Sequence, residues 1–459
     1  MSMTDIAPVA IPEVSIDGVT MGRLGLLKSA ERALREAGPV VRLLMPGGRA
    51  AVLLALPEHA AFWQDHPELF EKAASRPDTG AGLTREVLGH TLLTVPDGPD
   101  WQRMRQEMNG LLATARPWFH RPLARATGEL GTALSQGEGA LLDHCVAWAM
   151  RAICDPILGN AALDKAAHDL VMALTDGFTA RLEGQPQPDH LQPAFRAFLN
   201  RVACERGPDS IADLVVQNRP HDLEADLRSV VGGILAGSLH INALSLYWLL
   251  VQVADDPVLQ EALMVEAMGT ASGPRRAVDT PLAFATVREA QRLRPTMAFI
   301  ERQVRHGFQL GAYALQPGET VLFSPWFAQR DPVAWPDPLH FDPSRFLPGK
   351  HHTKGANLPF GLGPRQCPGA NLVNQQLTFA LSTLCCSGQL ALAPETRPGD
   401  LACVFRVNLE PRGALRLLLT PRPAPNDLKL MEEPHARRPL SRPVPDNPRQ
   451  AEPASPDRA

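Results

Sequence analysis

The sequence has few aromatic residues and no paired cysteine motif. Only 5% of the 459 residues are aromatic and two are tyrosines, so nothing indicates a stacking surface for sugars or nucleotides. The seven cysteines are odd in number and include no C-x-x-C pair, which argues against a zinc site or a disulfide framework and suits a reducing cytoplasm. With 45 Lys plus Arg against 49 Asp plus Glu, the charge is nearly balanced, and a nucleic-acid partner has no support.

The N-terminal region also lacks a long apolar run. No stretch there reaches the roughly 18 residues that a membrane span needs, and none resembles a signal peptide. We therefore expect a protein without a membrane anchor, located in the cytoplasm. From position 421 the composition changes: ten of the last 39 residues are proline and large apolar side chains are scarce, so we predict a disordered tail over 421–459.

One cysteine stands in a distinctive setting. Cys367 belongs to the run Phe-Gly-Leu-Gly-Pro-Arg-Gln-Cys-Pro-Gly over 360–369, ahead of an apolar helical run from Ala370 to Leu384. Glycines at 361 and 363 allow the backbone to approach a flat macrocycle, and the following helix directs its N-H groups toward the sulfur. A dinucleotide-binding loop is excluded because its third glycine would fall at Gln366. The pattern favours a thiolate ligand to haem iron over a structural cysteine.

These residues carry a family resemblance. Phe360, Gly363, Arg365, Cys367 and Gly369 match the Phe-x-x-Gly-x-Arg-x-Cys-x-Gly motif of the cytochrome P450 haem-thiolate family. The resemblance, to the soluble bacterial type, implies a mainly α fold with small β-sheets. It also implies haem b (iron protoporphyrin IX) between a long central helix and the cysteine loop, with Cys367 as the metal ligand. Because one pocket would draw on residues from 101 to 369, we expect residues 1–420 to form a single domain.

Two further motifs occur in the family's order. Glu289 and Arg292 lie three apart, on one helix face, and resemble the family's Glu-x-x-Arg pair; Arg345 lies in the segment that supplies its third member. A buried carboxylate between guanidiniums forms charge-assisted hydrogen bonds, so this set is expected to support the cysteine loop. Trp101 and Arg105, four apart, resemble the family's Trp-x-x-x-Arg helix, whose members bind a haem propionate.

The resemblance thus gives a set of expected cofactor contacts. Arg302 and Arg365 match further propionate-binding positions, and the two negative charges of the propionates call for several buried donors. The expected cofactor-binding residues are Trp101, Arg105, Arg302, Phe360, Gly361, Arg365, Cys367 and Gly369.

The long helix predicted from about Leu223 to Val253 departs from the family pattern. Ala236 and Gly237 match the small residues of the family's oxygen-binding segment and leave room for a diatomic ligand. Leu239 and His240 replace the acid and the alcohol that are implicated in proton delivery. His240 could donate a proton instead, or merely hydrogen-bond a carbonyl, a water or a polar substrate. Ala236, Gly237 and His240 are the expected catalytic residues.

Two enzyme classes fit. The first is a monooxygenase that inserts one oxygen atom from O2 into an apolar small molecule (a secondary metabolite, terpenoid or fatty-acid-like compound), with electrons from a ferredoxin or flavodoxin-type donor. The alternative, favoured by the missing acid and alcohol, is a peroxide-dependent oxidase or peroxygenase, or a dehydratase or isomerase. A non-enzymatic haem sensor has the least support. The resemblance places Arg103, Lys350 and Lys354 on the donor-facing surface.

The remaining patterns predict the elements around the site. We expect a helix over 21–38, a hairpin over 40–55, helical segments up to about 206 with a break near 184–188, and short strands over 299–323 and 388–418. Residues 74–99, rich in Gly, Pro, Asp and Thr, predict a long loop, which in the family covers the substrate. Residues 297–299 match a family segment that lines the pocket.

Overall fold

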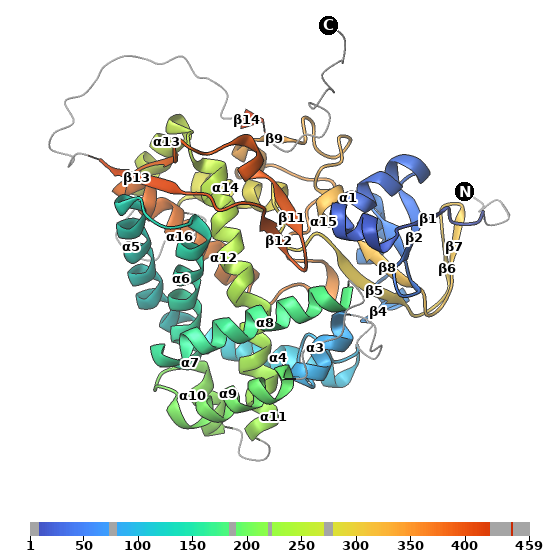
Figure 1. The fold of residues 1–459 in the computed structure, drawn as a ribbon, viewed down its shortest axis with the longest axis horizontal. Helices are drawn as coiled ribbons and strands as arrows, with labels where there is room; N and C mark the ends of the chain where they lie inside the picture. The colour runs from blue at the N-terminus through green and yellow to red at the C-terminus, as the bar shows by residue number, and fades with distance from the viewer. Residues whose placement is uncertain are drawn as a thin grey trace, which may run out of the picture.

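The computed structural model describes residues 9–72, 80–182, 190–218, 223–269, 279–422 and 442–443. Helices form most of the molecule and the strands gather mainly toward one side, with α12 (Gly233–Val253) running through the middle (Figure 1). The fold is therefore mainly α with small β-sheets, as the sequence predicts. The expected break near 184–188 and most of the expected tail lie outside the described residues.

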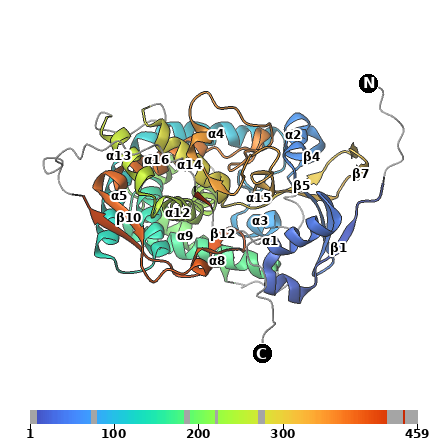
Figure 2. The same cartoon turned by 90° about the horizontal axis from the view of Figure 1, so that it is seen from above.

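The larger sheet stands beside the helical body. Its six strands follow the order β1-β2-β3-β8-β5-β4, and α1 (Gly18–Ala37) packs against it, as seen from above in Figure 2. The predicted helix and hairpin are confirmed: α1 ends before Gly38, whose φ of +94° favours glycine, and β2 pairs antiparallel with β3. The strands are β1 (Glu13–Ser15), β2 (Val40–Met45), β3 (Arg49–Leu54), β4 (Phe70–Glu71), β5 (Ile300–Val304) and β8 (Thr320–Phe323).

Four two-stranded sheets complete the β structure of the described residues. They pair β6 (Phe308–Leu310) with β7 (Tyr313–Leu315), β9 (His340–Phe341) with β14 (Arg442–Pro443), β10 (Gly388–Leu392) with β13 (Leu417–Pro421), and β11 (Cys403–Phe405) with β12 (Leu409–Pro411). The short strands expected over 299–323 and 388–418 are thus present.

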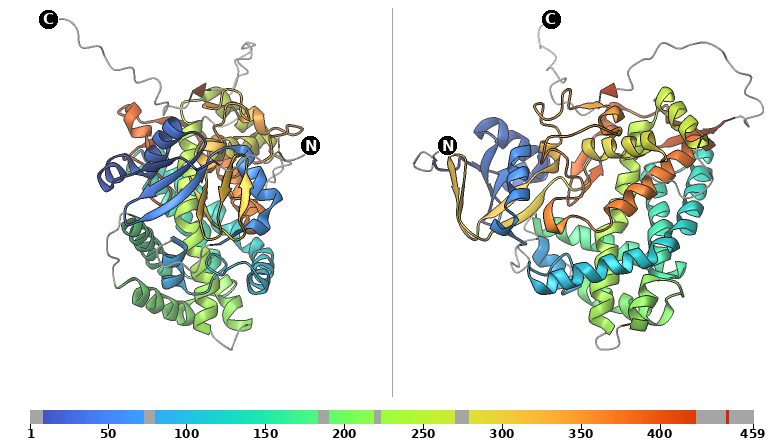
Figure 3. Two further views of the ribbon diagram at one scale, coloured as in Figure 1. Left: turned by 90° about the vertical axis from the view of Figure 1, so that its right-hand side faces the viewer. Right: turned by 180° about the vertical axis from the view of Figure 1, so that it is seen from behind.

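Helices surround α12 on several sides, as the two views of Figure 3 show. They are α2 (Pro57–Asp65), α3 (Gly80–Leu88), α4 (Pro99–Ala115), α5 (His120–Gln136), α6 (Leu141–Ala149), α7 (Asp155–Leu158), α8 (Asp164–Leu182), α9 (Leu191–Glu205), α10 (Ile211–Asn218), α11 (Leu223–Leu227), α13 (Pro257–Met268), α14 (Pro281–Leu293), α15 (Pro325–Ala328) and α16 (Ala370–Ser387). Short 3-10 and π turns occur between them, among them Arg116–Phe119, Met150–Cys154, Pro343–Phe346 and Gly363–Arg365.

The long helix expected from Leu223 to Val253 is continuous but not uniform. It consists of α11, a π-helical turn over Arg228–Gly232, and α12. By length and composition the stretch could cross a membrane, yet 67% of its most apolar window is buried inside the molecule. Most of α12 is buried in the largest apolar cluster, together with α5, α6 and α16, which explains its apolar composition.

The prediction of a long loop over 74–99 is wrong over residues 80–88. Residues 80–88 form α3, which packs against α8 and α9. Residues 73–79 lie outside the described part of the chain. The helix was hard to foresee because its first turn is Gly-Ala-Gly, which has low helix propensity, and tertiary packing decides its conformation. The segment that follows α3 is irregular, as expected.

Candidate functional site

A cavity of about 580 Å³ lies between α12 and the loop that carries Cys367. Its walls come from segments far apart in the sequence: α4, α8, α12, α14, α16, β5, the cysteine loop and the β11–β12 hairpin. All eight expected cofactor-binding residues line it, and so do Ala236 and Gly237. The cavity is therefore the candidate functional site.

The cysteine loop has a backbone that its glycines make possible. Gly361 has a φ of +73° and Gly363 a φ of +68°, a region that residues with a Cβ rarely adopt. The Cys367 N-H donates to the Phe360 carbonyl over 3.0 Å and closes the loop on itself. The chain then enters α16 directly after Gly369, so the sulfur lies at the start of that helix.

The environment of Cys367 has two opposing effects on the pKa of its thiol. Its side chain is open to the cavity but otherwise enclosed by protein, and this desolvation raises the thiol pKa. The N-H groups of Gly369 and Ala370, together with the nearby charge of Arg105, act in the opposite sense and stabilise the thiolate. Burial is the larger effect, so the free thiol is not strongly activated. A metal cation at the sulfur would reverse this balance.

One end of the cavity is cationic. Trp101 and Arg105 lie on the same face of α4, and Arg365 of the cysteine loop stacks on the Trp101 ring. Arg302 in β5 is 7% exposed, and its pKa is lowered to about 10 by burial and then by the charge of Arg365. Arg365 itself donates to Asp97 Oδ1 over 2.5 Å. The structure thus brings Trp101, Arg302 and Arg365 together, whereas Arg105 donates to the Gln366 carbonyl and lies nearer Cys367.

Lys72 is a cavity residue that the sequence interpretation missed. It follows β4, lines the cavity, and its pKa is lowered to about 8 by burial and then by the charge of Arg302. A single lysine in a sequence carries no signal of its own. Only the pairing of β4 with β5 brings Lys72 to Arg302.

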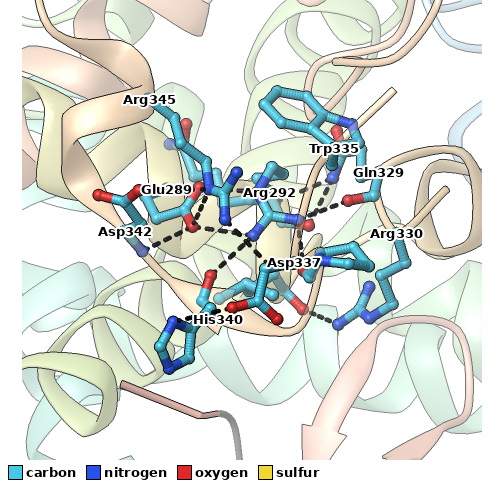
Figure 4. A network of polar contacts seen from close by, with 12 residues as sticks. Glu289, Arg292, Gln329, Arg330, Trp335, Asp337, His340, Asp342 and Arg345 are labelled. Atoms are coloured by element: carbon cyan, nitrogen blue, oxygen red, sulfur yellow. Dashed lines mark hydrogen bonds and ion pairs between the residues drawn. The ribbon is translucent and has the colours of Figure 1, made fainter. Parts of the chain in front are cut away.

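The predicted contacts of Glu289 with Arg292 and Arg345 are present (Figure 4). Arg292 donates to both Glu289 carboxylate oxygens, over 2.7 and 2.8 Å, with neither side chain exposed. Arg345 Nε lies 3.5 Å from Glu289 Oε1, which also accepts from the Asp342 N-H over 2.9 Å. Burial raises the pKa of Glu289, while the arginines and that N-H hold its charge.

Arg292 also links this group to the chain that precedes the cysteine loop. It donates to the carbonyls of Gln329, Pro338 and His340 and lies over the Trp335 ring. The amide of Gln329 in turn accepts from the Leu358 N-H over 2.8 Å, two residues before Phe360. The network is therefore scaffolding, because none of its charged members lines the cavity.

The structure places His240 differently from our expectation. Ala236 and Gly237 line the cavity and so does Ile241, whereas His240 and Leu239 do not. Leu239 lies in the main apolar cluster. The imidazole of His240 is buried instead beside Glu410, with Nε2 3.5 Å from Oε1. This position, outside the cavity lining, does not favour the role of His240 as a proton donor to a bound ligand.

The rest of the cavity wall is largely apolar. Met297 and Phe299 line it, as expected, but Ala298 does not, because it packs into the cluster around the larger sheet. Leu92 and Leu93, from the irregular part of the expected substrate-covering segment, also face the cavity. An apolar small molecule fits such a wall.

The site fits haem by its own chemistry. A sulfur stands on one wall and small residues of α12 contribute to another. Among the described residues, the cluster of Lys72, Arg302 and Arg365 has only Asp97 and Glu301 as nearby carboxylates. Burying like charges together is costly without an anion between them, and two propionates would supply it. Cys367 would hold the iron, and Trp101, Arg105, Arg302 and Arg365 would hold the propionates.

Comparison with known proteins gives one consistent result. A family model for cytochrome P450 matches residues 165–402. Cyclooctatin synthase of Streptomyces melanosporofaciens is 28% identical over 433 residues, which cover 81% of this chain and 90% of that protein. Flavonoid 3'-monooxygenase of Oryza sativa subsp. japonica is 27% identical over 58% of this chain, and dihydroniloticin synthase of Melia azedarach 27% over 43%.

These comparisons differ in extent. The matches span 53% and 40% of the two plant proteins, so the chain covers about half of their length or less. Among solved structures, that of a cyanobacterial CYP120A1 with bound retinoic acid superposes with a TM-score of 0.75 over 91% of this chain and all of that one, at 17% identity. That likeness concerns the fold.

Proposed function

The chain belongs to the cytochrome P450 family, and on that premise we propose that it is a haem-thiolate monooxygenase that inserts one oxygen atom from O2 into an apolar small molecule. The observation that carries the proposal is a single cavity with the Cys367 sulfur on one wall, a cationic end, and the small residues Ala236 and Gly237 on α12. Bound haem b would supply the oxygen chemistry, and its thiolate ligand favours O–O cleavage.

The residues of the chain would hold and orient the reactants. Once iron is bound, the amides of Gly369 and Ala370 would help to stabilise the charge on Cys367 Sγ, and the buried cations would orient the haem through its propionates. Phe360 would shield the sulfur from water. Gly237 presents no side chain to the cavity, which leaves space for a diatomic ligand.

The substrate proposed is a terpenoid-like or fatty-acid-like secondary metabolite. The wall around Met297, Phe299, Leu92 and Leu93 supports an apolar ligand. The names of two similar proteins, cyclooctatin synthase and the retinoic-acid-bound CYP120A1, also refer to small organic molecules. A ferredoxin or flavodoxin-type protein is the proposed electron donor, and a cytoplasmic location stays a prediction.

One observation favours a second candidate. Leu239 and His240 occupy the positions that hold the acid and the alcohol for proton delivery in the family, and neither of them faces the cavity. A peroxide-dependent oxidase or peroxygenase, or a dehydratase or isomerase of an oxygenated substrate, needs no such route. This is the alternative proposal.

Turnover assays separate the two candidates. Purified holoprotein is given a panel of apolar compounds that shift its haem absorption, either with NADPH, O2, ferredoxin and ferredoxin reductase or with hydrogen peroxide alone. A monooxygenase forms a product containing one atom from ¹⁸O2 only in the first mixture. Product formed only with peroxide, or with neither oxidant, would support the alternative and contradict O2 activation.

A further inference from the structure

A buried contact between a histidine and a carboxylate lies behind the cavity wall. The side chains of His240 and Glu410 are 4% and 12% exposed, and Nε2 of the imidazole lies 3.5 Å from Oε1 of the carboxylate. Within the described part of the chain, neither imidazole nitrogen nor that oxygen has a hydrogen-bond partner. Because burying polar groups costs free energy unless they interact, each side chain depends on the other.

The two residues belong to different walls of the same cavity. Ala236, one helical turn before His240 on α12, lines the cavity. Glu410 lies in β12, opposite Val404 in the short β11–β12 hairpin. The connecting residues of that hairpin, Val407 and Asn408, line the cavity together with Phe405. The contact between His240 and Glu410 therefore joins the helix to the hairpin just outside the space that a ligand would fill.

The backbone of the hairpin is fixed at the neighbouring residue. The Leu409 N-H donates to the Thr296 carbonyl over 2.8 Å, and its carbonyl accepts from the Trp248 indole over 2.8 Å. Trp248 belongs to α12, so the Glu410 side chain adds a second contact between the hairpin and that helix. Two further titratable side chains face the pair. Arg406 Nη1 lies 4.0 Å from Glu410 Oε2, and His168 of α8, which contacts Asp169, lies close enough to His240 for the two imidazoles to affect each other.

From this arrangement we propose that His240 and Glu410 hold the β11–β12 hairpin against α12. This contact, which we call the latch, thereby determines the affinity of the cavity for bulky apolar ligands. Both are positioning residues, since neither lines the cavity. The proposal rests on the proposed function only in taking the cavity as the haem and substrate site.

The test uses two haem-binding probes of different size. Imidazole is small and does not need the space beside Phe405, whereas 4-phenylimidazole carries an apolar ring into the cavity. Their dissociation constants are measured from the haem absorption shift of holoprotein carrying Glu410→Gln, His240→Gln or both. Glu410→Gln keeps the side-chain shape, and Glu395→Gln is the matched control, because Glu395 pairs with Arg416 on the surface.

For the latch we expect each single variant to change the 4-phenylimidazole dissociation constant by about fivefold or more and imidazole by less than about twofold. The double variant should resemble one single variant, since the effects of contacting residues do not add. Equal changes for both probes, additive effects, or no change in Glu410→Gln would overturn the proposal. Absence of haem binding in the unaltered protein is a different result, which would overturn the proposed function.

Discussion

The guanidinium of Arg365 lies over the indole ring of Trp101, 4.8 Å from its centre. One residue comes from the cysteine loop and the other from α4, more than 260 positions earlier. Their contact places a cation at one end of the cavity, next to Arg302.

The sulfur of Cys367 should be the iron ligand. Cys367→Ala should abolish the absorption band that marks thiolate ligation in the ferrous carbon monoxide adduct, because no other cysteine lines the cavity within the described residues. Cys386→Ser is the control and should keep the band, since Cys386 lies in the last turn of α16. A normal band in Cys367→Ala would refute the assignment of the ligand.

Lys72 should make haem binding depend on pH. In the haem-free fold its pKa is lowered to about 8, against 10.5 for the free side chain, so between these values the unfolded chain holds a proton that the fold does not. The stability of the haem-free protein should therefore rise as the pH increases across this window. Propionates would stabilise the charged form of Lys72, so above about pH 8 the lysine would take up a proton when haem binds. Haem affinity should therefore fall as the pH rises above about 8.

Haem transfer to an acceptor protein, followed by absorbance at pH 7 to 10, measures this effect. Lys72→Gln should release haem several-fold faster at pH 7 and lose most of the pH dependence above 8. Lys350→Gln, at an exposed position, is the control. An unchanged pH profile in Lys72→Gln would show that Lys72 does not interact with the propionates.

Breaking the Glu289–Arg292 pair should destabilise the fold without touching the cavity. Glu289→Gln leaves the fully buried Arg292 without its counter-charge, a loss of about 3 to 5 kcal/mol of unfolding free energy. Urea unfolding followed by circular dichroism measures it, and haem content should fall as well. Glu205→Gln breaks the solvent-exposed pair with Arg201 and should change little. Equal stability of the two variants would contradict a supporting role.

The residues of α12 that line the cavity predict at which position an alcohol side chain would assist proton delivery. Ile241 faces the cavity one turn after Gly237, so Ile241→Thr should raise the fraction of electrons recovered as product in a monooxygenase. A peroxide-dependent enzyme or a dehydratase should gain nothing. Ile241→Val controls for the loss of volume, and product and NADPH consumption are measured together.

His240→Ala tests the proton-donor role that the sequence left open. A donor in the cavity is typically worth about 10² to 10⁴ in rate, so a loss well below tenfold with haem incorporation intact would exclude it. We expect the smaller loss, because the imidazole faces Glu410. The replacement of Leu239 and His240 by Asp and Thr is a poorer probe, since Leu239 is buried in the main apolar cluster.

The donor-docking surface is also testable. Arg103 pairs with Asp100 and Lys354 with Asp65, while Lys350 is exposed. Reversing all three charges with Glu should slow reduction by a ferredoxin-type donor and weaken its salt dependence, with ligand affinity unchanged. Stopped-flow reduction at two ionic strengths measures this, and unchanged rates would place the docking surface elsewhere.

The sequence was most informative where function depends on a short local motif. The cysteine loop needs glycines at two positions of positive φ and a cysteine at a helix start, and all of these are adjacent in the chain. Glu289 and Arg292 were recognisable because their spacing places them on one helix face. Such local geometry can be derived without knowing what packs against it.

Predictions failed where a distant segment decides the outcome. Helical periodicity puts Ala236, Gly237, His240 and Ile241 on neighbouring parts of α12, but the β11–β12 hairpin covers His240 and leaves Ile241 at the cavity. Lys72 joins the cationic end only through the pairing of β4 with β5, some 230 residues later in the chain. Neither result has a local signal.

Arg365 also joins the cysteine loop to the wall segment at 92–97. Besides Asp97, its guanidinium donates to the carbonyls of Leu92 and Val95, in the segment that lines the apolar wall. A propionate on this arginine would hold the cysteine loop and that wall segment together. Amide hydrogens around 92–97 should therefore exchange with solvent more slowly once haem is bound, so that cofactor loading itself orders this segment of the cavity wall.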